Sequence, residues 1–294
     1  MSLRLFAALF LAGLGVLAPA WGARDVRVTG SDLLGAAFSR ALAEHARQSA
    51  IAVEQDFRGT RPGLEKLAAG TADVGLIMLP PGEVPAFDGL TARVIGYQPV
   101  VIVAPEAAAV TQVTFPQLRA LFGTGAIESI KTWGELGVRG EDRSRPVELH
   151  ALAPTHGLTL PLFRRLLLND GPVRGDVKLA DSAVALEQAL RGATHALGLS
   201  PALPAAGSGL RALAVATSVS DPATLPTEEN LHQGSYALRL PLYVVFRREA
   251  APELLPFLRF LLSDECAGTL QQAHFLPLPV TARNQLVFEI EEMR

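Results

Sequence analysis

Residues 51–79 read IAVEQDFRGTRPGLEKLAAGTADVGLIML, and their pattern predicts a strand, a helix and a second strand in direct succession. Residues 51–57 are predicted to form the first strand. A short amphipathic helix follows, with Thr60 as its N-cap and Gly70 at its end. The nearly continuous apolar run at 73–79 predicts a buried strand. This order is typical of an α/β fold, in which crossover helices join parallel strands and ligands bind beyond the carboxyl ends of the strands.

The alternation extends in both directions from this stretch. A strand at 25–29 leads into a helix that is capped by Ser31 or Asp32. Much further along the chain, residues 203–231 are rich in Pro, Ala, Gly, Ser and Thr, which predicts long surface connections. Further strands are predicted at 100–103, 147–152, 196–200 and 240–246, and helices at 115–122, from 155 onward, at 182–191, 251–262 and 265–273. No fixed-period repeat is present, which excludes solenoids and propellers.

Composition and motifs exclude several classes of protein. With 49% hydrophobic and 19% charged residues the chain is globular, and with a net charge of -3 and no basic run interleaved with aromatics it is not expected to bind nucleic acid. Cys266 is the only cysteine, so no internal disulfide can form, and a buried, inert thiol is expected. The sequence lacks nucleotide-binding and hydrolase motifs, and its six histidines lack metal-ligand spacing. We therefore expect no enzyme, no metal and no cofactor.

The first 23 residues have the pattern of a secretory signal peptide. Arg4 supplies the positive charge, residues 5–17 form an apolar run too short to span a membrane, and small residues follow. Because no cysteine stands directly after the run, a lipid anchor has no attachment point there. We expect cleavage after this segment and a soluble periplasmic protein.

Three predicted loop-to-helix junctions place small or hydroxyl residues where a helix begins. They are Gly30-Ser31-Asp32, Gly59-Thr60-Arg61 and Thr155-His156-Gly157. Unpaired backbone N–H groups and the positive end of the helix dipole favour an anion at such a position. Ser, Thr and Asp are also ordinary helix caps, so the junctions indicate a binding site only if they converge.

Several segments together resemble the periplasmic phosphate-binding proteins of phosphate ABC transporters, as a divergent member of the type II periplasmic-binding-protein superfamily. The matching segments are Gly30-Ser31-Asp32, residues 58–60 with 70–75, residues 115–125 (FPQLRALFGTG) with 132–137 (TWGELG), and residues 234–244 (GSYALRLPLYV). They follow the order of that family along nearly the whole chain after residue 23.

The resemblance implies a two-lobed α/β fold, each lobe a mixed, mostly parallel sheet flanked by helices. Residues 24–100 and 242–294 would form the first lobe and residues 101–241 the second. The chain would cross between the lobes near 97–105 and 235–245, and the ligand would lie in the cleft between them.

The resemblance also implies a set of site residues, which this sequence matches in part. In the family, hydroxyls at the first two junctions and a serine-glycine-threonine turn hold the anion, with an arginine before the turn and a carboxylate after the second junction. Ser31, Thr60 and Gly157 match in type. Four positions depart: His156 replaces serine, Leu158 threonine, Leu152 the arginine and Met78 the carboxylate.

The expected ligand-binding set is therefore Ser31, Asp32, Arg58, Gly59, Thr60, Arg61, Thr155, His156 and Gly157. Because a buried oxyanion needs its charge compensated, Arg58 or Arg61 would supply the missing cation. Met78, Leu152 and Leu158 would alternatively make a less polar cleft for another ligand or for none.

The leading functional interpretation is a monomeric receptor that binds phosphate or another small anion and delivers it to an ABC permease. The alternative is an accessory or sensory protein that keeps the fold but has a degenerate cleft and does not bind phosphate. An enzyme is the third interpretation, for which no catalytic pair is found.

We predict that the exported chain begins between residues 21 and 24, because a signal peptidase cleaves after small residues of the kind found at 18–23. Mass spectrometry of the intact protein from a periplasmic fraction measures this terminus. A membrane fraction in which the protein retains Met1 would contradict the prediction.

Overall fold

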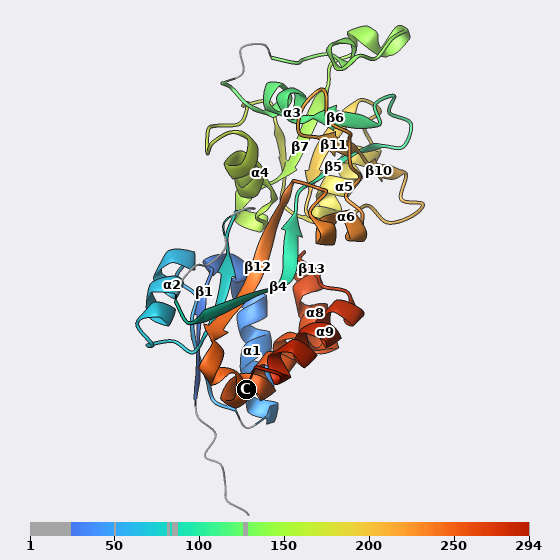
Figure 1. Ribbon diagram of the computed structural model, residues 1–294. Helices are drawn as coiled ribbons and strands as arrows, with labels where there is room; N and C mark the ends of the chain where they lie inside the picture. The colour runs from blue at the N-terminus through green and yellow to red at the C-terminus, as the bar shows by residue number, and fades with distance from the viewer. Residues whose placement is uncertain (1–24, 50, 81–82, 84–87, 126–128, 294) are drawn as a thin grey trace, which may run out of the picture.

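The computed structural model describes residues 25–49, 51–80, 83, 88–125 and 129–293, and the predicted signal peptide lies outside them. Two α/β lobes lie one above the other, each built around its own sheet (Figure 1). No helix within the described ranges is long and apolar enough to cross a membrane.

The first lobe contains a sheet of six strands. In spatial order they are β13 (Leu276–Pro277), β4 (Leu90–Pro99), β12 (Arg239–Arg247), β3 (Val74–Met78), β1 (Val26–Gly30) and β2 (Val53–Asp56). The flanking helices are α1 (Gly35–Ser49), α2 (Thr60–Ala68), α7 (Ala251–Leu261), α8 (Asp264–Gln272) and α9 (Val280–Glu291). Short 3-10 turns, η1 (Asp32–Leu34) and η5 (Arg248–Ala250), precede α1 and α7.

The second lobe contains a sheet of five strands. These are β10 (Leu210–Ala212), β5 (Val101–Pro105), β9 (Ala196–Ser200), β7 (Glu148–Leu152) and β8 (Lys178–Ala180). Its helices are α3 (Phe115–Phe122), α4 (Thr159–Leu167) and α5 (Ala183–Arg191), and β6 (Gln112–Thr114) pairs with β11 (Ala214–Ala216). The 3-10 turns η2 (Trp133–Leu136), η3 (Glu141–Ser144) and η4 (Pro154–His156) complete it, and α6 (Glu228–Gln233) contacts β4 of the first lobe.

Both sheets are mixed, as the sequence predicts, but parallel pairing is confined to one half of each. In the first lobe β1 pairs in parallel with β2 and β3, whereas β12 is antiparallel to β3 and β4. In the second lobe β7 is parallel to β8 and β9, whereas β5 is antiparallel to β9 and β10. Neither sheet is therefore mostly parallel. The strands before and after the first crossing, β4 and β5, are each antiparallel to both of their neighbours.

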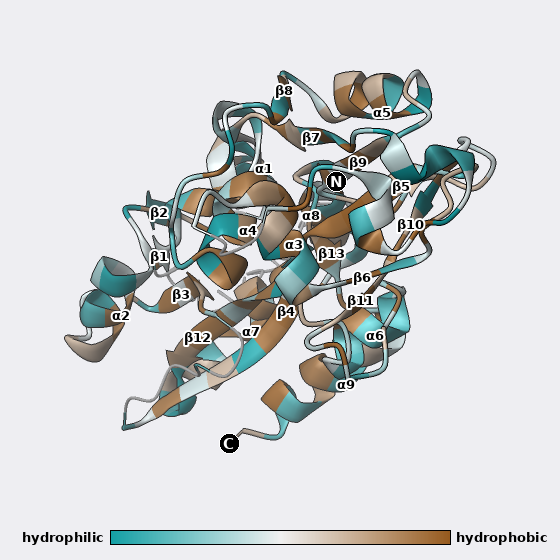
Figure 2. Cartoon of the chain, turned by 90° about the horizontal axis from the view of Figure 1, so that it is seen from above, coloured by the Kyte–Doolittle hydropathy of each residue, from teal (hydrophilic) through white to brown (hydrophobic). Residues whose placement is uncertain are grey.

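Other elements pack against both faces of each sheet. The side chains of a strand, which point alternately to opposite sides, therefore belong to two different core clusters. In β5, Val101 and Val103 pack on the side of α5, while Ile102 and Ala104 belong to the core on the other side. The first-lobe sheet is divided in the same way between α2 and the layer of α1 and α7. Figure 2 shows the hydrophobic colour concentrated along the strands and on the helix surfaces next to them.

Three local predictions need correction. Residues 203–231 are more than surface connections, since they contain β10, β11 and the start of α6. The helix expected from residue 155 begins at Thr159, after the separate turn η4. The N-cap of α2 is Gly59, with φ at 126°, whereas Thr60 is the first helical residue. At the first junction the cap is Ser31, whose hydroxyl accepts a hydrogen bond from the Leu33 N–H.

The chain passes between the two sheets at Val100, and the segment that returns it lies alongside. The Val100 N–H donates to the Leu238 carbonyl at 2.9 Å, and the fully buried Tyr236 hydroxyl donates to the Val100 carbonyl at 2.8 Å. Burial raises the pKa of the Tyr236 hydroxyl, so it stays protonated and remains a donor. These two hydrogen bonds join the connections between the lobes.

We expect Tyr236→Phe to lower the free energy of unfolding by about 1–3 kcal/mol, because a buried carbonyl loses a hydrogen-bond donor. Tyr97→Phe is the control, since the Tyr97 hydroxyl makes a longer bond of 3.4 Å to the His232 carbonyl. Urea denaturation measures both changes. A larger loss for Tyr97→Phe than for Tyr236→Phe would contradict the role given to this bond.

Candidate binding site between the lobes

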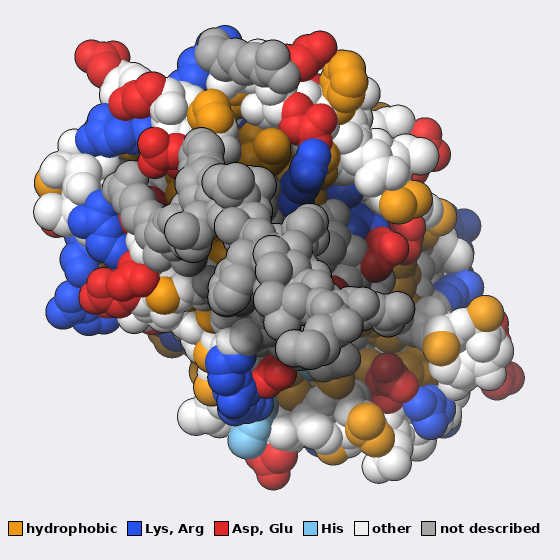
Figure 3. Space-filling view, turned by 90° about the horizontal axis from the view of Figure 1, so that it is seen from below, with side chains coloured by type: hydrophobic (Ala, Val, Ile, Leu, Met, Phe, Trp, Pro, Cys, Tyr) orange, Lys and Arg blue, Asp and Glu red, His pale blue; other side chains and the backbone are white. Residues whose placement is uncertain are grey.

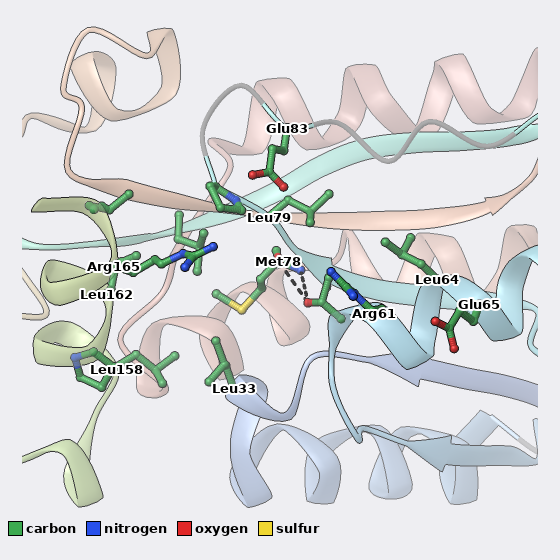
Figure 4. A pocket seen from close by; sticks show the side chains of 15 residues that line it. Leu33, Arg61, Leu64, Glu65, Met78, Leu79, Glu83, Leu158, Leu162 and Arg165 are labelled. Carbon is green, nitrogen blue, oxygen red and sulfur yellow. Dashed lines mark hydrogen bonds between the residues drawn. The ribbon is translucent and has the colours of Figure 1, made fainter. Parts of the chain in front are cut away.

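A cleft of about 750 Å³ lies between the lobes and has walls from both. The first lobe contributes the end of β3, the first two turns of α2, Leu33 and Leu240, and the second lobe contributes one side of α4. Figure 4 shows Arg61 and Arg165 reaching into this space from α2 and α4. The cleft therefore lies beyond the carboxyl ends of parallel strands, where the sequence predicts it.

The first two predicted junctions converge at this end of the sheet. The Gly59 N–H donates to the Gly30 carbonyl at 2.9 Å, and the Ser31 N–H donates to the Leu76 carbonyl at 2.8 Å. Gly30 has φ at 144°, and a Cβ at this position would lie 2.0 Å from the Leu76 carbonyl oxygen. Only glycine allows the two strands to approach so closely.

The hydroxyl groups at these junctions are occupied by the protein itself. The Thr60 hydroxyl donates to the Met78 carbonyl at 3.0 Å and accepts from the Met78 N–H at 3.4 Å, as the dashed lines in Figure 4 show. Ser31 is buried, and its oxygen accepts from the Leu33 N–H at 3.2 Å. These groups hold the junctions together, which limits what they can offer a ligand.

The start of α2 retains unused donors. Pro62 has no N–H, and the Gly63 N–H donates to the Gly59 carbonyl at 3.1 Å. The backbone N–H groups of Thr60 and Arg61 are the remaining first-turn donors, which an α-helix leaves without an internal partner. They lie on the wall of the cleft, at the positive end of the helix dipole.

The two arginines beside this helix start have different roles. Arg58 binds Asp56 through two hydrogen bonds, of 2.6 and 2.7 Å, and Lys66 pairs with the same carboxylate. The pKa of Asp56 falls well below its ordinary value, first because of Arg58 and then because of Lys66. The charge of Arg58 is thus compensated at the end of β2, whereas Arg61 has no ion pair or side-chain hydrogen bond with any residue that the structure describes.

The third predicted junction contributes less than expected. Thr155 and His156 are exposed outside the lining of the cleft, and the His156 ring lies 4.0 Å from Asp181. Leu152 is buried in the core, against Gly157, so it does not line the cleft. Asp32 is exposed and also outside the lining. Of the three departures that would make the cleft less polar, the structure places Met78 and Leu158 in its wall.

Three charged residues of the cleft, Glu65, Glu83 and Arg165, were not predicted from the sequence. Arg165 follows Leu158 by seven positions, so the two share a helix face with Leu162, and this spacing could have revealed it. Arg165 pairs with Asp170 at 2.5 Å, and its pKa rises because of Asp170, with a smaller contribution from Glu83. Glu65 lies one turn after Arg61 on α2, a spacing that could have revealed it as well.

Other reactive groups lie away from the cleft. Burial raises the pKa of the Cys266 thiol to about 12, so it is a protonated core residue, as the sequence predicts. Within the described ranges, no cluster of His, Cys, Asp and Glu could hold a metal ion. In Figure 3, basic and acidic side chains are interspersed over the visible part of the lower face, in keeping with the small net charge of -3.

Two lobes with a cleft between them define the fold of the periplasmic binding proteins. A family model described as a PBP superfamily domain matches residues 17–265, and the chain belongs to this superfamily. The phosphate-binding protein PstS of Pseudomonas aeruginosa strain PAO1 is 25% identical over 243 residues, which cover 76% of this chain and 73% of that protein. The resemblance found in the sequence is thereby confirmed, and the low identity fits a divergent member.

Solved structures show the same fold. A possible phosphate binding protein from Planctomyces limnophilus has a TM-score of 0.73 at 20% identity, covering 92% of this chain and 99% of that one. PstS from Borrelia burgdorferi has a TM-score of 0.67 at 18% identity, covering 87% of this chain and 99% of that one. At these identities the likeness concerns the fold and leaves the ligand open.

We expect the stability that Asp56 provides to depend on pH. Its folded pKa is lowered, so the contribution is complete above the unfolded pKa of about 4 and is lost as the pH falls toward the folded value. Asp56→Asn should therefore cost on the order of 1 kcal/mol at pH 7 and progressively less between about pH 5 and pH 3. Urea denaturation of both proteins at these pH values measures the difference, and a constant difference would contradict the prediction.

Proposed function

We propose that this protein is an exported solute receptor that binds an anion in the interlobe cleft and delivers it to an ABC permease. The observation that carries the proposal is Arg61. It is a cation in the wall of the cleft without a partner among the described residues, and it adjoins the two unused N–H groups at the start of α2. Membership of a superfamily of two-lobed binding proteins, and the name of the Pseudomonas relative, support a receptor over an enzyme.

The chemistry of this corner suits an oxyanion. A helix N-terminus supplies donors but only about half a unit of positive charge, so a full cation is needed nearby. The guanidinium of Arg61 supplies that charge, and its planar fork matches the geometry of a carboxylate or phosphate. Ser31, Gly59 and Thr60 hold this corner in shape, whereas Asp32, Thr155, His156 and Gly157 lie outside the lining of the cleft.

A ligand that contacts both α2 and α4 would favour a conformation in which the two lobes have closed around it. Binding to one conformation in preference to another shifts the population toward it, and hinge closure around a solute is the usual form of this response. The units that close would be residues 24–100 with 242–294, and residues 101–241. Export by a cleaved signal peptide, a periplasmic location and a monomeric state belong to the same proposal.

Two contacts within the protein favour an accessory or sensory protein that does not bind phosphate. The Thr60 hydroxyl is bonded to Met78, and Arg58 is bonded to Asp56. The cleft therefore offers few polar groups to a small, highly charged ion, although Arg61 is still available to some anion.

We expect Arg61→Ala to weaken the binding of any anion in the cleft about tenfold or more, because a hydrogen bond to a charged group contributes about 1.5–3 kcal/mol. Arg58→Ala is the matched control, since Arg58 is paired with Asp56, and it should change the affinity less than twofold. Isothermal titration calorimetry with phosphate, sulfate and a series of carboxylates measures both.

Two results would count against the proposal, the first against the receptor function and the second against the site. If no anion binds at millimolar concentration, the accessory role becomes the better explanation. If an anion binds equally well to the wild type and to Arg61→Ala, its site lies elsewhere in the molecule.

A further inference from the structure

The lining of the interlobe cleft is mainly apolar. Ten of the 15 lining residues carry leucine, methionine or proline side chains. Leu33, Leu64 and Met78 come from the first lobe, and Leu158, Leu162 and Leu166 from α4 of the second. Figure 4 shows Leu33, Met78 and Leu158 around one part of the space, beside the start of α2. The apolar surface thus faces the cleft from both lobes and adjoins the anion-binding corner.

The charges in the lining nearly cancel. Arg61 and Arg165 are positive and Glu65 and Glu83 negative, and Arg165 is also paired with Asp170 outside the lining. Among the described residues Arg61 is thus the lining cation without an ion pair, and Glu65 and Glu83 are lining carboxylates without one, so the lining has no surplus of positive charge. A dianion would need more compensation than one guanidinium and two N–H groups provide, because an uncompensated buried charge costs several kcal/mol. A ligand with a single negative charge, bound next to Arg61, is therefore favoured over a dianion.

The size of the cleft points the same way. About 750 Å³ lies in the range of pockets that hold organic molecules, roughly 300–1,000 Å³, and such pockets are lined mainly by apolar side chains with a few polar groups that fix the orientation. A tetrahedral oxyanion of five heavy atoms would fill only the corner next to Arg61. The remaining volume is bounded by leucine, methionine and proline.

We propose that the cleft binds an amphipathic organic acid, with a carboxylate at Arg61 and the start of α2, and an apolar body between Leu33 and Met78 on one side and Leu158 and Leu162 on the other. This inference rests on the proposed receptor function and gives it a substrate class. The carboxylate accepts hydrogen bonds from the Arg61 guanidinium and from the backbone N–H groups of Thr60 and Arg61. The apolar body fills the cleft between the lobes, so that burial of its surface draws α4 toward α2.

The test is a calorimetric titration of the mature protein with acetate, butyrate, hexanoate and octanoate, with inorganic phosphate and sulfate, and with 1-octanol. Burial of one methylene group is worth up to about fourfold in affinity, so each should tighten carboxylate binding by roughly two- to fourfold. Octanoate should bind at least about tenfold more tightly than phosphate. It should also bind about tenfold more tightly than 1-octanol, which lacks the charge that Arg61 recognises.

Matched variants separate the contribution of the apolar wall to ligand binding from any effect on folding. Leu33 is 37% exposed, so Leu33→Gln should leave the melting temperature within a few degrees of the wild type while it lowers the affinity for octanoate about fivefold or more. Leu158→Gln should act in the same direction. Neither change should alter the affinity for acetate, which does not reach this wall. Leu179→Gln is the control, since Leu179 is 53% exposed on β8, outside the lining, and octanoate should bind to it as to the wild type.

The possible failures are distinguishable. Phosphate or sulfate binding more tightly than octanoate, with no effect of carboxylate chain length but a loss in Arg61→Ala, would overturn the substrate class and leave the receptor standing. The absence of binding by every compound in the series would overturn both. Octanoate binding that Leu33→Gln, Leu158→Gln and Leu179→Gln leave unchanged would show a site other than this cleft.

Discussion

The close contact between Gly30 and the Leu76 carbonyl is the constraint on which the binding corner depends. β1 and β3 can end side by side only because no side chain stands between them, and Gly63 lets α2 settle onto the same point, since a Cβ there would lie 2.9 Å from the Gly30 Cα. The hydrogen bonds from Gly59 to Gly30 and from Thr60 to Met78 then fix the start of α2 against both strand ends. Arg61 takes its place in the wall of the cleft as a consequence of this backbone packing.

The same packing divides the local charges. Asp56 ends β2 next to α2 and collects Arg58 and Lys66, so these two cations stabilise the lobe. Arg61 is three residues further along the chain than Arg58 but on the helix, where it points into the cleft (Figure 4). A short segment thereby provides both a structural ion pair and a cation in the wall of the cleft. On the opposite wall Arg165 is compensated by Asp170, which leaves the cleft close to neutral and gives its leucines the larger part of the surface.

Much of the secondary structure could be predicted, because burial imposes a regular period on the sequence. β3, α3 and β9 match their predicted ranges to within a residue, since each has an apolar pattern that ends at a clear signal. β4 and α9 were missed for the opposite reason. The first half of β4 is only partly buried and carries Arg93, and α9 buries Arg283, whose guanidinium donates to the Leu278 and Leu262 carbonyls and to Asp264. When the hydrogen-bond partners of a buried charged residue are distant in the chain, the local sequence does not show that the residue is buried.

The sequence by itself determined the α/β class, the order of the most strongly patterned elements, the buried cysteine and the helix start at Gly59-Thr60-Arg61, because these follow from neighbours in the chain. It also identified Arg58 and Arg61 as candidate cations. Only the tertiary structure pairs Arg58 with Asp56 and leaves Arg61 in the wall of the cleft. It also places Met78, Leu158 and Arg165 in that wall, and His156 and Leu152 outside it. The physical reason is that a side chain is occupied or available according to partners brought to it by folding, and those partners are distant in sequence or belong to the other lobe.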